Sequence, residues 1–226
     1  MIDFIQQATN GFVAMSHWEY VAVALSLAYL LLAMKQSLWC WPAAFFSTLI
    51  YTVLFYNGAL LMDSLLNVFY MAMAFYGWYS WHQGSNKPHM ETTAKEVLPI
   101  QTLSPLKHGW MIVITLAISL ALGYLMDNYT HADFAYLDSI TTCFSVVATW
   151  LIARKVLENW LWWVVIDAVS IYLYINKGYY PTTILFSLYT LMAAWGYLQW
   201  RQEVLSGNNS DGNSGGADCQ SIPSKS

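Results

Sequence analysis

Charge is scarce in this chain of 226 residues. Lys, Arg, Asp and Glu together make up only 10% of the sequence, whereas hydrophobic residues make up 58%. An ordinary soluble domain carries roughly 25% charged residues, because its surface faces water. The composition therefore excludes an ordinary soluble domain. With 9 basic against 13 acidic residues, we also expect no nucleic-acid partner.

Cysteine is scarce as well, and the motifs of common enzyme sites are missing. The three cysteines have no metal-ligand or disulfide spacing, and none of the five histidines has the spacing of a zinc protease. No Gly-rich phosphate loop is present, and no nucleophile and base lie at comparable depth in an apolar segment. The sequence therefore predicts no catalytic residue, no metal site and no cofactor. The cysteines, which we expect to serve only in packing, are Cys40, Cys143 and Cys219.

Long apolar runs separate the few charges. A helix needs about 20 residues to cross the hydrocarbon core of a bilayer, and these runs are apolar on all sides, unlike the alternating strands of a barrel. The sequence therefore predicts an all-α, polytopic membrane protein with seven transmembrane helices. The predicted spans are residues 18–34, 38–56, 59–81, 109–126, 139–153, 160–176 and 181–200.

The segments between the spans complete the predicted organisation. Residues 1–17 form an external segment with no basic leader, so we expect no cleavable signal peptide. Residues 82–108 form a polar cytoplasmic loop, and residues 201–226, rich in Gly, Ser and Asn from position 206, form a disordered cytoplasmic tail.

The positions of the basic residues predict the orientation. Lys and Arg in short loops stay on the cytoplasmic side of a membrane. With the N-terminus outside and the C-terminus in the cytoplasm of a bacterial inner membrane, only Lys177 falls outside. The basic residues that fall inside are Lys35, Lys87, Lys95, Lys107, Arg154, Lys155, Arg201 and Lys225.

The chain also resembles itself. A shift of 119 residues without a gap superimposes the first three spans (18–81) on the last three (139–200), with residue 20 on 139 and residue 81 on 200. The pairs that coincide include Lys35 with Arg154, Trp41 with Trp160, Asn57 with Asn176, Tyr70 with Tyr189, Gly77 with Gly196 and Trp81 with Trp200. The span at 109–126 is then a linker, and the architecture is 3+1+3 with parallel repeats. Parallel repeats occur in transporters, where the solute site lies at the repeat interface.

One ionisable residue lies deep in a predicted span. Asp167 is near the middle of the sixth span, and a charge at that depth is costly enough to be a functional candidate. Spacings of three and four residues place Trp163, Ser170 and Tyr174 on the same helical face. This aromatic, acidic and hydroxyl face predicts a substrate-binding surface; the alternative is an Asp that only hydrogen-bonds a neighbouring helix.

The third span carries a second polar face, formed by Asp63, Asn67 and Tyr70. Asp63 is expected at the outer mouth, and Asn67 is deep enough to offer both a donor and an acceptor to a solute. Polar residues of this kind also join helices, which is the alternative role for Asn67. Thr48 and Tyr51 on the second span are weaker candidates.

Other functional classes fit less well. A membrane enzyme needs a catalytic pair, and a channel needs polar stripes on several helices instead of two. A structural membrane protein has no need of an acid in the middle of a span. A transporter is the remaining class.

Residues 154–167 read RKVLENWLWWVVID, and LYINKGY follows at 173–179. This stretch, with YGWYSW at 76–81, resembles the signature region of PnuC-type nicotinamide riboside transporters, and the likeness runs from about residue 18 to 200. The resemblance implies a bundle similar to that of SWEET sugar transporters, a homotrimer, and facilitated diffusion of a vitamin that a cytoplasmic kinase then traps.

The chain departs from that family in its third span, where riboside carriers usually have Gln and this chain has Asn67. The shorter amide favours a thiamine-carrying branch of the same family as an alternative. Both solutes are flat heteroaromatic cations with hydroxyl groups, so aromatic faces and one buried carboxylate suit either of them. An anionic mononucleotide is disfavoured, because no basic residue lies within the spans to meet its phosphate.

Overall fold

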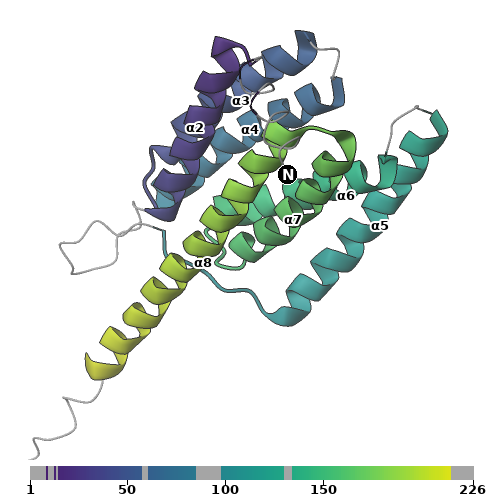
Figure 1. Cartoon of the computed structure of the whole chain (residues 1–226). Coiled ribbons are helices and arrows are strands. Elements are labelled where there is room, and N and C mark those ends of the chain that lie inside the picture. Colours follow the sequence, from purple (N-terminus) through teal and green to yellow (C-terminus); the bar gives the residue numbers. More distant parts are fainter. Residues whose placement is uncertain are drawn as a thin grey trace, which may run out of the picture.

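The computed structural model describes residues 9, 13, 15–57, 61–84, 98–129 and 134–214. Over these ranges the chain forms seven long helices and no strand, only a single bridge between Gln101 and Val156. The helices are α2 (His17–Met34), α3 (Cys40–Asn57), α4 (Leu61–Gly84), α5 (Pro105–Tyr129), α6 (Ala135–Ala153), α7 (Asn159–Lys177) and α8 (Tyr180–Ser214). The all-α architecture with seven helices is confirmed, and Figure 1 shows its arrangement.

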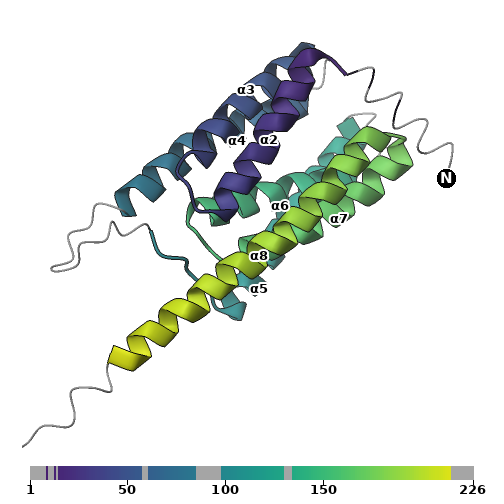
Figure 2. The same ribbon diagram turned by 60° about the vertical axis from the view of Figure 1, so that its left-hand side comes forward.

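The predicted spans agree with the helices to within a few residues except at α8. This helix continues to Ser214, fourteen residues beyond the predicted end at 200, and projects past the other helices (Figure 2). The helix thus includes residues 201–214 of the predicted tail, and residues 215–226 lie outside the described part of the chain. By length and composition alone, three helices are apolar enough to cross a membrane, namely α2, α5 and α6.

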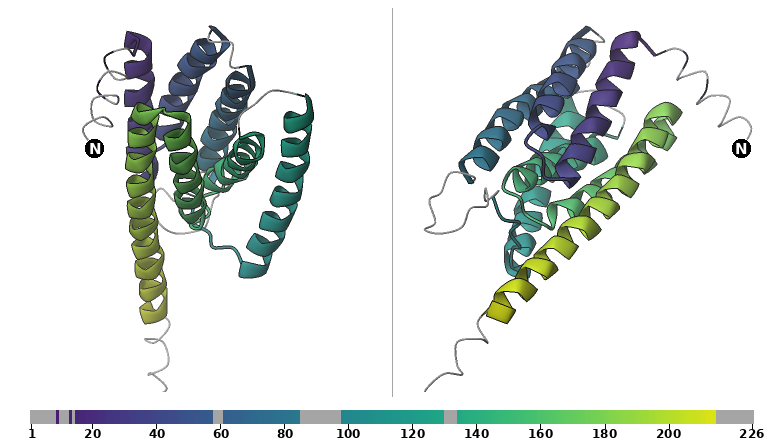
Figure 3. Two further views of the ribbon diagram at one scale, coloured as in Figure 1. Left: turned by 45° about the vertical axis from the view of Figure 1, so that its right-hand side comes forward. Right: turned by 90° about the vertical axis from the view of Figure 1, so that its left-hand side faces the viewer.

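The helices form two triplets and one linker. Helix α3 packs between α2 and α4, and α7 packs between α6 and α8, while α5 lies at the outside against α6 (Figure 3). The triplets meet through α4 with α6 and through α2 with α8. A shift of 119 residues converts one of these interfaces into the other, as an approximate two-fold axis requires.

The two triplets also share the turn that follows their first helix. Both α2 and α6 end in a Schellman motif: Ser37 N–H bonds to Leu32 C=O at 2.9 Å, and Val156 N–H bonds to Leu151 C=O at 3.0 Å. The residue that such a motif places in the left-handed region is usually Gly. Here it is Gln36 (φ 53°) and Lys155 (φ 52°), which are 119 positions apart.

Tryptophans fill the core at one end of the bundle. We call this end the basic end, because it carries Lys35, Lys107, Arg154, Lys155 and Arg201; the opposite end, with Asp63, Asp127 and Asp138, is the acidic end. Two tryptophan pairs, each packed edge to face with ring centroids 5.3 and 5.4 Å apart, repeat the same contact in the two triplets: Trp41 with Trp81, and Trp160 with Trp200. These four indoles are at most 2% exposed. They close the basic end around the axis.

Candidate functional site

Asp167 lies inside the molecule, at the middle of α7. Its side chain is 3% exposed and that of Ser170, one turn later, is 4% exposed. Among the described residues, no donor bonds to the Asp167 carboxylate and no cation pairs with it. A buried carboxylate without a partner is costly, which keeps Asp167 as the main candidate for contact with a solute.

Tyrosines from both triplets surround this carboxylate. Asp167 interacts electrostatically with the hydroxyls of Tyr70 on α4 and Tyr189 on α8. The two tyrosines are 119 positions apart, and their hydroxyls interact with Ser145 and Ser26, which are 119 positions apart as well. The site is therefore bounded on two sides by equivalent Tyr and Ser pairs across the repeat interface.

Three of these residues were not predicted from the sequence: Tyr189, Ser26 and Ser145. The signal for Tyr189 was available, because Tyr70 is a candidate and the repeat places Tyr189 at the equivalent position. Single hydroxyls such as Ser26 carry no signal of their own, since many helices contain a Ser that bonds its own backbone.

The weaker candidates direct their polar atoms partly to their own helices. Asn67 is buried and its amide nitrogen donates to Asp63 C=O at 2.8 Å, which leaves its side-chain oxygen and its second N–H available to a solute. The Thr48 hydroxyl bonds to Ala44 C=O at 2.9 Å, also within its helix. The Thr48 hydroxyl is thus already bonded within its own helix.

The aromatic candidates are engaged in apolar and ring contacts. Trp163 packs against both hydrophobic core clusters, so much of its ring is in apolar contact. Tyr174 packs against Phe186 with ring centroids 5.2 Å apart, and Tyr51 stacks on Phe55 at 5.6 Å. Of the predicted face of α7, Asp167 and Ser170 are the buried polar members.

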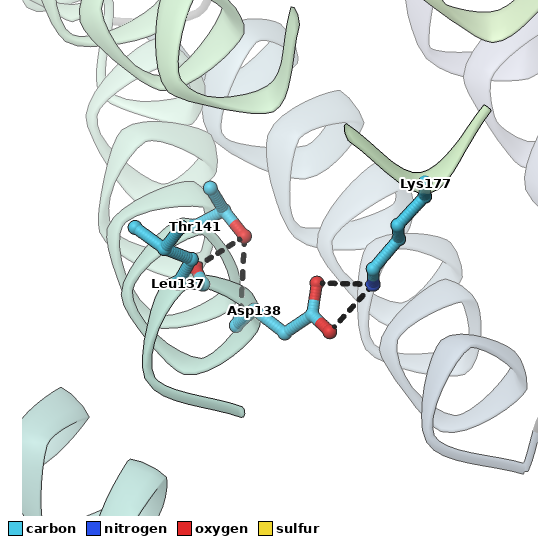
Figure 4. Close-up of polar contacts among 4 residues, drawn as sticks. All are labelled: Leu137, Asp138, Thr141 and Lys177. Atoms are coloured by element: carbon cyan, nitrogen blue, oxygen red, sulfur yellow. Dashed lines mark hydrogen bonds and ion pairs between the residues drawn. The ribbon is translucent and has the colours of Figure 1, made fainter. Parts of the chain in front are cut away.

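At the acidic end, one cation lies between carboxylates. The Lys177 ammonium bonds both oxygens of Asp138, at 2.8 and 3.1 Å (Figure 4). Asp63 on α4 interacts electrostatically with both of them. The predicted place of Asp63 at the mouth of the pathway thus coincides with a charged cluster of two acids and one base.

Two surface hollows lie away from the candidate site. A surface hollow of about 240 Å³ lies at the basic end, lined by Met34, Lys35, Gln36, Gln199 and Glu203. A second hollow lies on α8, between Leu191 and Gln202. Neither hollow is lined by a predicted site residue.

Comparison with known proteins adds to this geometry. Residues 16–202 match the family described as nicotinamide mononucleotide transporter. The riboflavin/roseoflavin transporter RibM of Streptomyces davaonensis is 28% identical over 80% of this chain and 83% of its own. The nicotinamide riboside transporter PnuC of Escherichia coli is 27% identical over 67% of this chain and 71% of its own.

A crystal structure of the vitamin B3 transporter PnuC has the same fold. It superimposes with a TM-score of 0.67 and 18% identity, over 88% of both chains. The resemblance in the sixth and third spans is thereby confirmed at the level of the family. The matching segment holds both triplets and the linker helix, and the chain belongs to the nicotinamide mononucleotide transporter family of membrane proteins.

Proposed function

We propose that this protein carries a small cationic vitamin, nicotinamide riboside, across the bacterial inner membrane by facilitated diffusion. The observation that carries the proposal is the Asp167 carboxylate: the residue is 3% exposed, and among the described residues no donor is hydrogen-bonded to the carboxylate and no cation is paired with it. A bound cation supplies the missing partner, and the Tyr70 and Tyr189 rings provide π faces for a flat heteroaromatic ring.

Two other solutes have specific support. Thiamine is favoured by Asn67, which stands where riboside carriers usually have Gln, and it also carries a positive charge. Riboflavin is favoured by the name of one relative, RibM, but its ring system is neutral and gives Asp167 no partner. The charge of the solute therefore separates riboflavin from the two cations.

Calorimetric titration of the purified protein with each of the three compounds tests these candidates. Asp167→Asn keeps the shape of the side chain but removes the charge. We expect it to weaken binding of a cation by about ten- to a hundredfold, which corresponds to roughly 1.5–3 kcal/mol for a hydrogen bond to a charged group. Asp127→Asn removes an exposed carboxylate at the acidic end and serves as the matched control.

The outcomes are distinct. If Asp167 only braces helices, Asp167→Asn lowers the folded yield and leaves the affinity of the surviving protein unchanged. If no compound binds the wild type, the alternative of a structural membrane protein is favoured instead. If riboflavin is the one compound that binds, and Asp167→Asn does not change its affinity, the solute is a flavin and not a cationic vitamin.

The direction and energetics belong to the same proposal. With the basic end in the cytoplasm, the N-terminus is outside and the C-terminus inside. The chain has no nucleotide-binding loop and no second acid deep in a span for a proton relay, so we expect equilibration without accumulation. Net uptake then depends on a cytoplasmic kinase that modifies the vitamin. Accumulation above the external concentration in kinase-free proteoliposomes contradicts this part.

The oligomeric state is also proposed from the family resemblance. We expect a homotrimer, and light scattering of the purified protein with correction for bound detergent measures its mass. A monomer of 25.7 kDa contradicts the trimer without affecting the proposed solute.

A further inference from the structure

We propose that Gln36 and Lys155 form a gate at the basic end, and that the Lys155 ammonium, buried while this gate is closed, favours its opening. The inference rests on the proposed function for the existence of a solute pathway. It concerns the part of that pathway between Asp167 and the basic end.

The two residues meet where the triplets meet. The Lys155 ammonium donates to the side-chain oxygen Oε1 of Gln36 at 2.9 Å. Equivalent residues of two triplets related by a two-fold rotation can touch only near the rotation axis. A solute that leaves the repeat interface along this axis must separate Gln36 from Lys155.

The backbone holds both side chains at this meeting point. Each residue occupies the left-handed position of a Schellman motif, which most non-Gly residues adopt at a cost. The turn that contains Lys155 is also fixed from outside, because Gln101 bonds through its N–H to Lys155 C=O at 2.9 Å and through its C=O to Leu157 N–H at 2.8 Å. Gly would adopt the left-handed conformation at a lower energy, yet both positions carry long polar side chains. This points to a role for the side chains themselves.

The closed gate buries a charge that is poorly satisfied. Lys155 is 0% exposed, and its ammonium has three donors but only one bonded acceptor among the described residues, Gln36. The ring of Trp81, 4.6 Å away, adds a cation–π contact. Water satisfies an ammonium better than one amide and one ring do, so hydration of Lys155 favours the open state.

The tryptophans beneath the gate add to this effect. The buried indole N–H groups of Trp41, Trp81 and Trp160 find no acceptor in the described part of the chain. Each unpaired buried donor opposes the closed state. Only Trp200 is paired, through a hydrogen bond of 3.0 Å to Met34 C=O.

The protonation of Lys155 is consistent with this geometry. The residue lies in the turn between α6 and α7, and burial lowers its pKa from 10.5 to about 8. The ionisable groups that act on it are Glu203 on α8 and Cys40 on α3, which oppose the shift without cancelling it. Glu203 also accepts a hydrogen bond from the Gln36 amide nitrogen.

A native thiol provides the reporter for the gate. Cys40 is 0% exposed and belongs to the core cluster that lies beneath Lys155. With Cys143 and Cys219 replaced by Ser, its rate of labelling by N-ethylmaleimide in the full chain reports how often the basic end opens.

The test is a double-mutant cycle on Gln36→Ala and Lys155→Met. Among the described residues, Gln36 is the one acceptor bonded to the buried ammonium. Gln36→Ala removes it, so we expect labelling to become about tenfold faster, the lower end for loss of a hydrogen bond to a charged group. In the Lys155→Met background there is no charge to leave unpaired, and Gln36→Ala should change the rate less than twofold. Because both proteins in that comparison lack the ammonium, its direct effect on the reactivity of Cys40 cancels.

If Gln36 and Lys155 only pack the basic end together, the cycle gives a different pattern. It predicts equal acceleration by Gln36→Ala in both backgrounds, and that result overturns the proposal. Lys35→Met, which removes an exposed charge from the same turn, is the matched control and should leave the rate unchanged.

A second measurement follows exchange of labelled nicotinamide riboside and of thiamine in proteoliposomes. Lys155→Met should slow exchange several-fold, because the closed gate no longer buries a charge, and unchanged exchange contradicts the role of the charge. If the wild type exchanges neither compound, the proposed function fails, whereas the labelling cycle still decides whether Gln36 and Lys155 form a gate.

Discussion

Lys155 donates a hydrogen bond of 2.9 Å to Gln36, and the 119 positions between them are the interval that relates the two triplets. Two identical residues at such a contact face a restriction. Two lysines there repel each other, because both ammonium groups lie buried near the axis. The replacement of one by Gln therefore gives the contact a donor and an acceptor, and it marks the point where the two repeats must differ.

The first prediction concerns the pH dependence of stability. The pKa of Lys155 is about 8 in the folded protein and 10.5 at its ordinary value. Between these values the unfolded chain holds a proton that the folded chain has released, so the free energy of unfolding rises with pH. Lys155→Met lacks this dependence. We expect the apparent melting temperature of the wild type, relative to that of Lys155→Met, to increase from about pH 7.5 to about pH 9.5.

Both proteins must be measured in the same detergent and buffers, since other groups titrate in the same range and cancel only in the difference. A difference that stays constant with pH places the Lys155 ammonium in water and contradicts its burial.

The second prediction concerns the glycines beneath the tryptophans. A Cβ atom at Gly77 would lie 2.2 Å from the Trp41 ring, and one at Gly196 would lie 2.8 Å from the Trp160 ring. Both rings are buried and cannot move aside. Gly77→Ala should therefore lose stability, because overpacking costs about 1–3 kcal/mol and the better helix propensity of Ala returns about 1 kcal/mol.

Gly109→Ala is the matched control, because no atom lies within 4 Å of the added Cβ. It should leave the melting temperature unchanged or raise it slightly. Equal effects at Gly77 and Gly109 contradict the close packing of the tryptophans.

The sequence predicted most of the fold because its two signals, the apolar runs and the 119-residue repeat, can be read directly along the chain. The same 119-residue shift relates the helix boundaries, the two Schellman turns and the tryptophan pairs. The end of α8 was not predicted, since its last residues are polar and rich in Gly, Ser and Asn, a composition typical of disorder.

The site was predicted in part for a related reason. Asp167 is visible because a charge deep in an apolar segment is rare. Lys155 was not predicted as a functional residue. The sequence places it in a basic loop, where lysine is usually hydrated, and only the packing of the other triplet buries it. Burial that depends on the partner triplet cannot be read from the segment itself.

The third prediction concerns the topology. Asn57 ends α3 at the acidic end, and Ser206 lies on α8 beyond the basic end; both are exposed. With the N-terminus outside, a cysteine introduced at Asn57 should react with an impermeant thiol reagent added to intact cells, and one at Ser206 should react only after the cells are opened. Labelling of the Ser206 position alone in intact cells reverses the orientation.

The last prediction concerns the charged cluster at the acidic end. Lys177 and Asp138 form an ion pair whose side chains are 22% and 36% exposed, so the pair contributes at most about 1 kcal/mol to stability. Its larger effect is on charge at the mouth: Lys177→Ala leaves Asp63 and Asp138 without their cation. A cationic solute should then associate faster at low ionic strength, because the local potential becomes more negative. The gain should vanish in about 1 M salt, where charges are screened within about 3 Å.

Stopped-flow binding of nicotinamide riboside and thiamine measures the rates, and Lys107→Ala, an exposed lysine at the basic end, is the control. An acceleration that persists in high salt assigns Lys177 a steric role in the entrance instead of an electrostatic one.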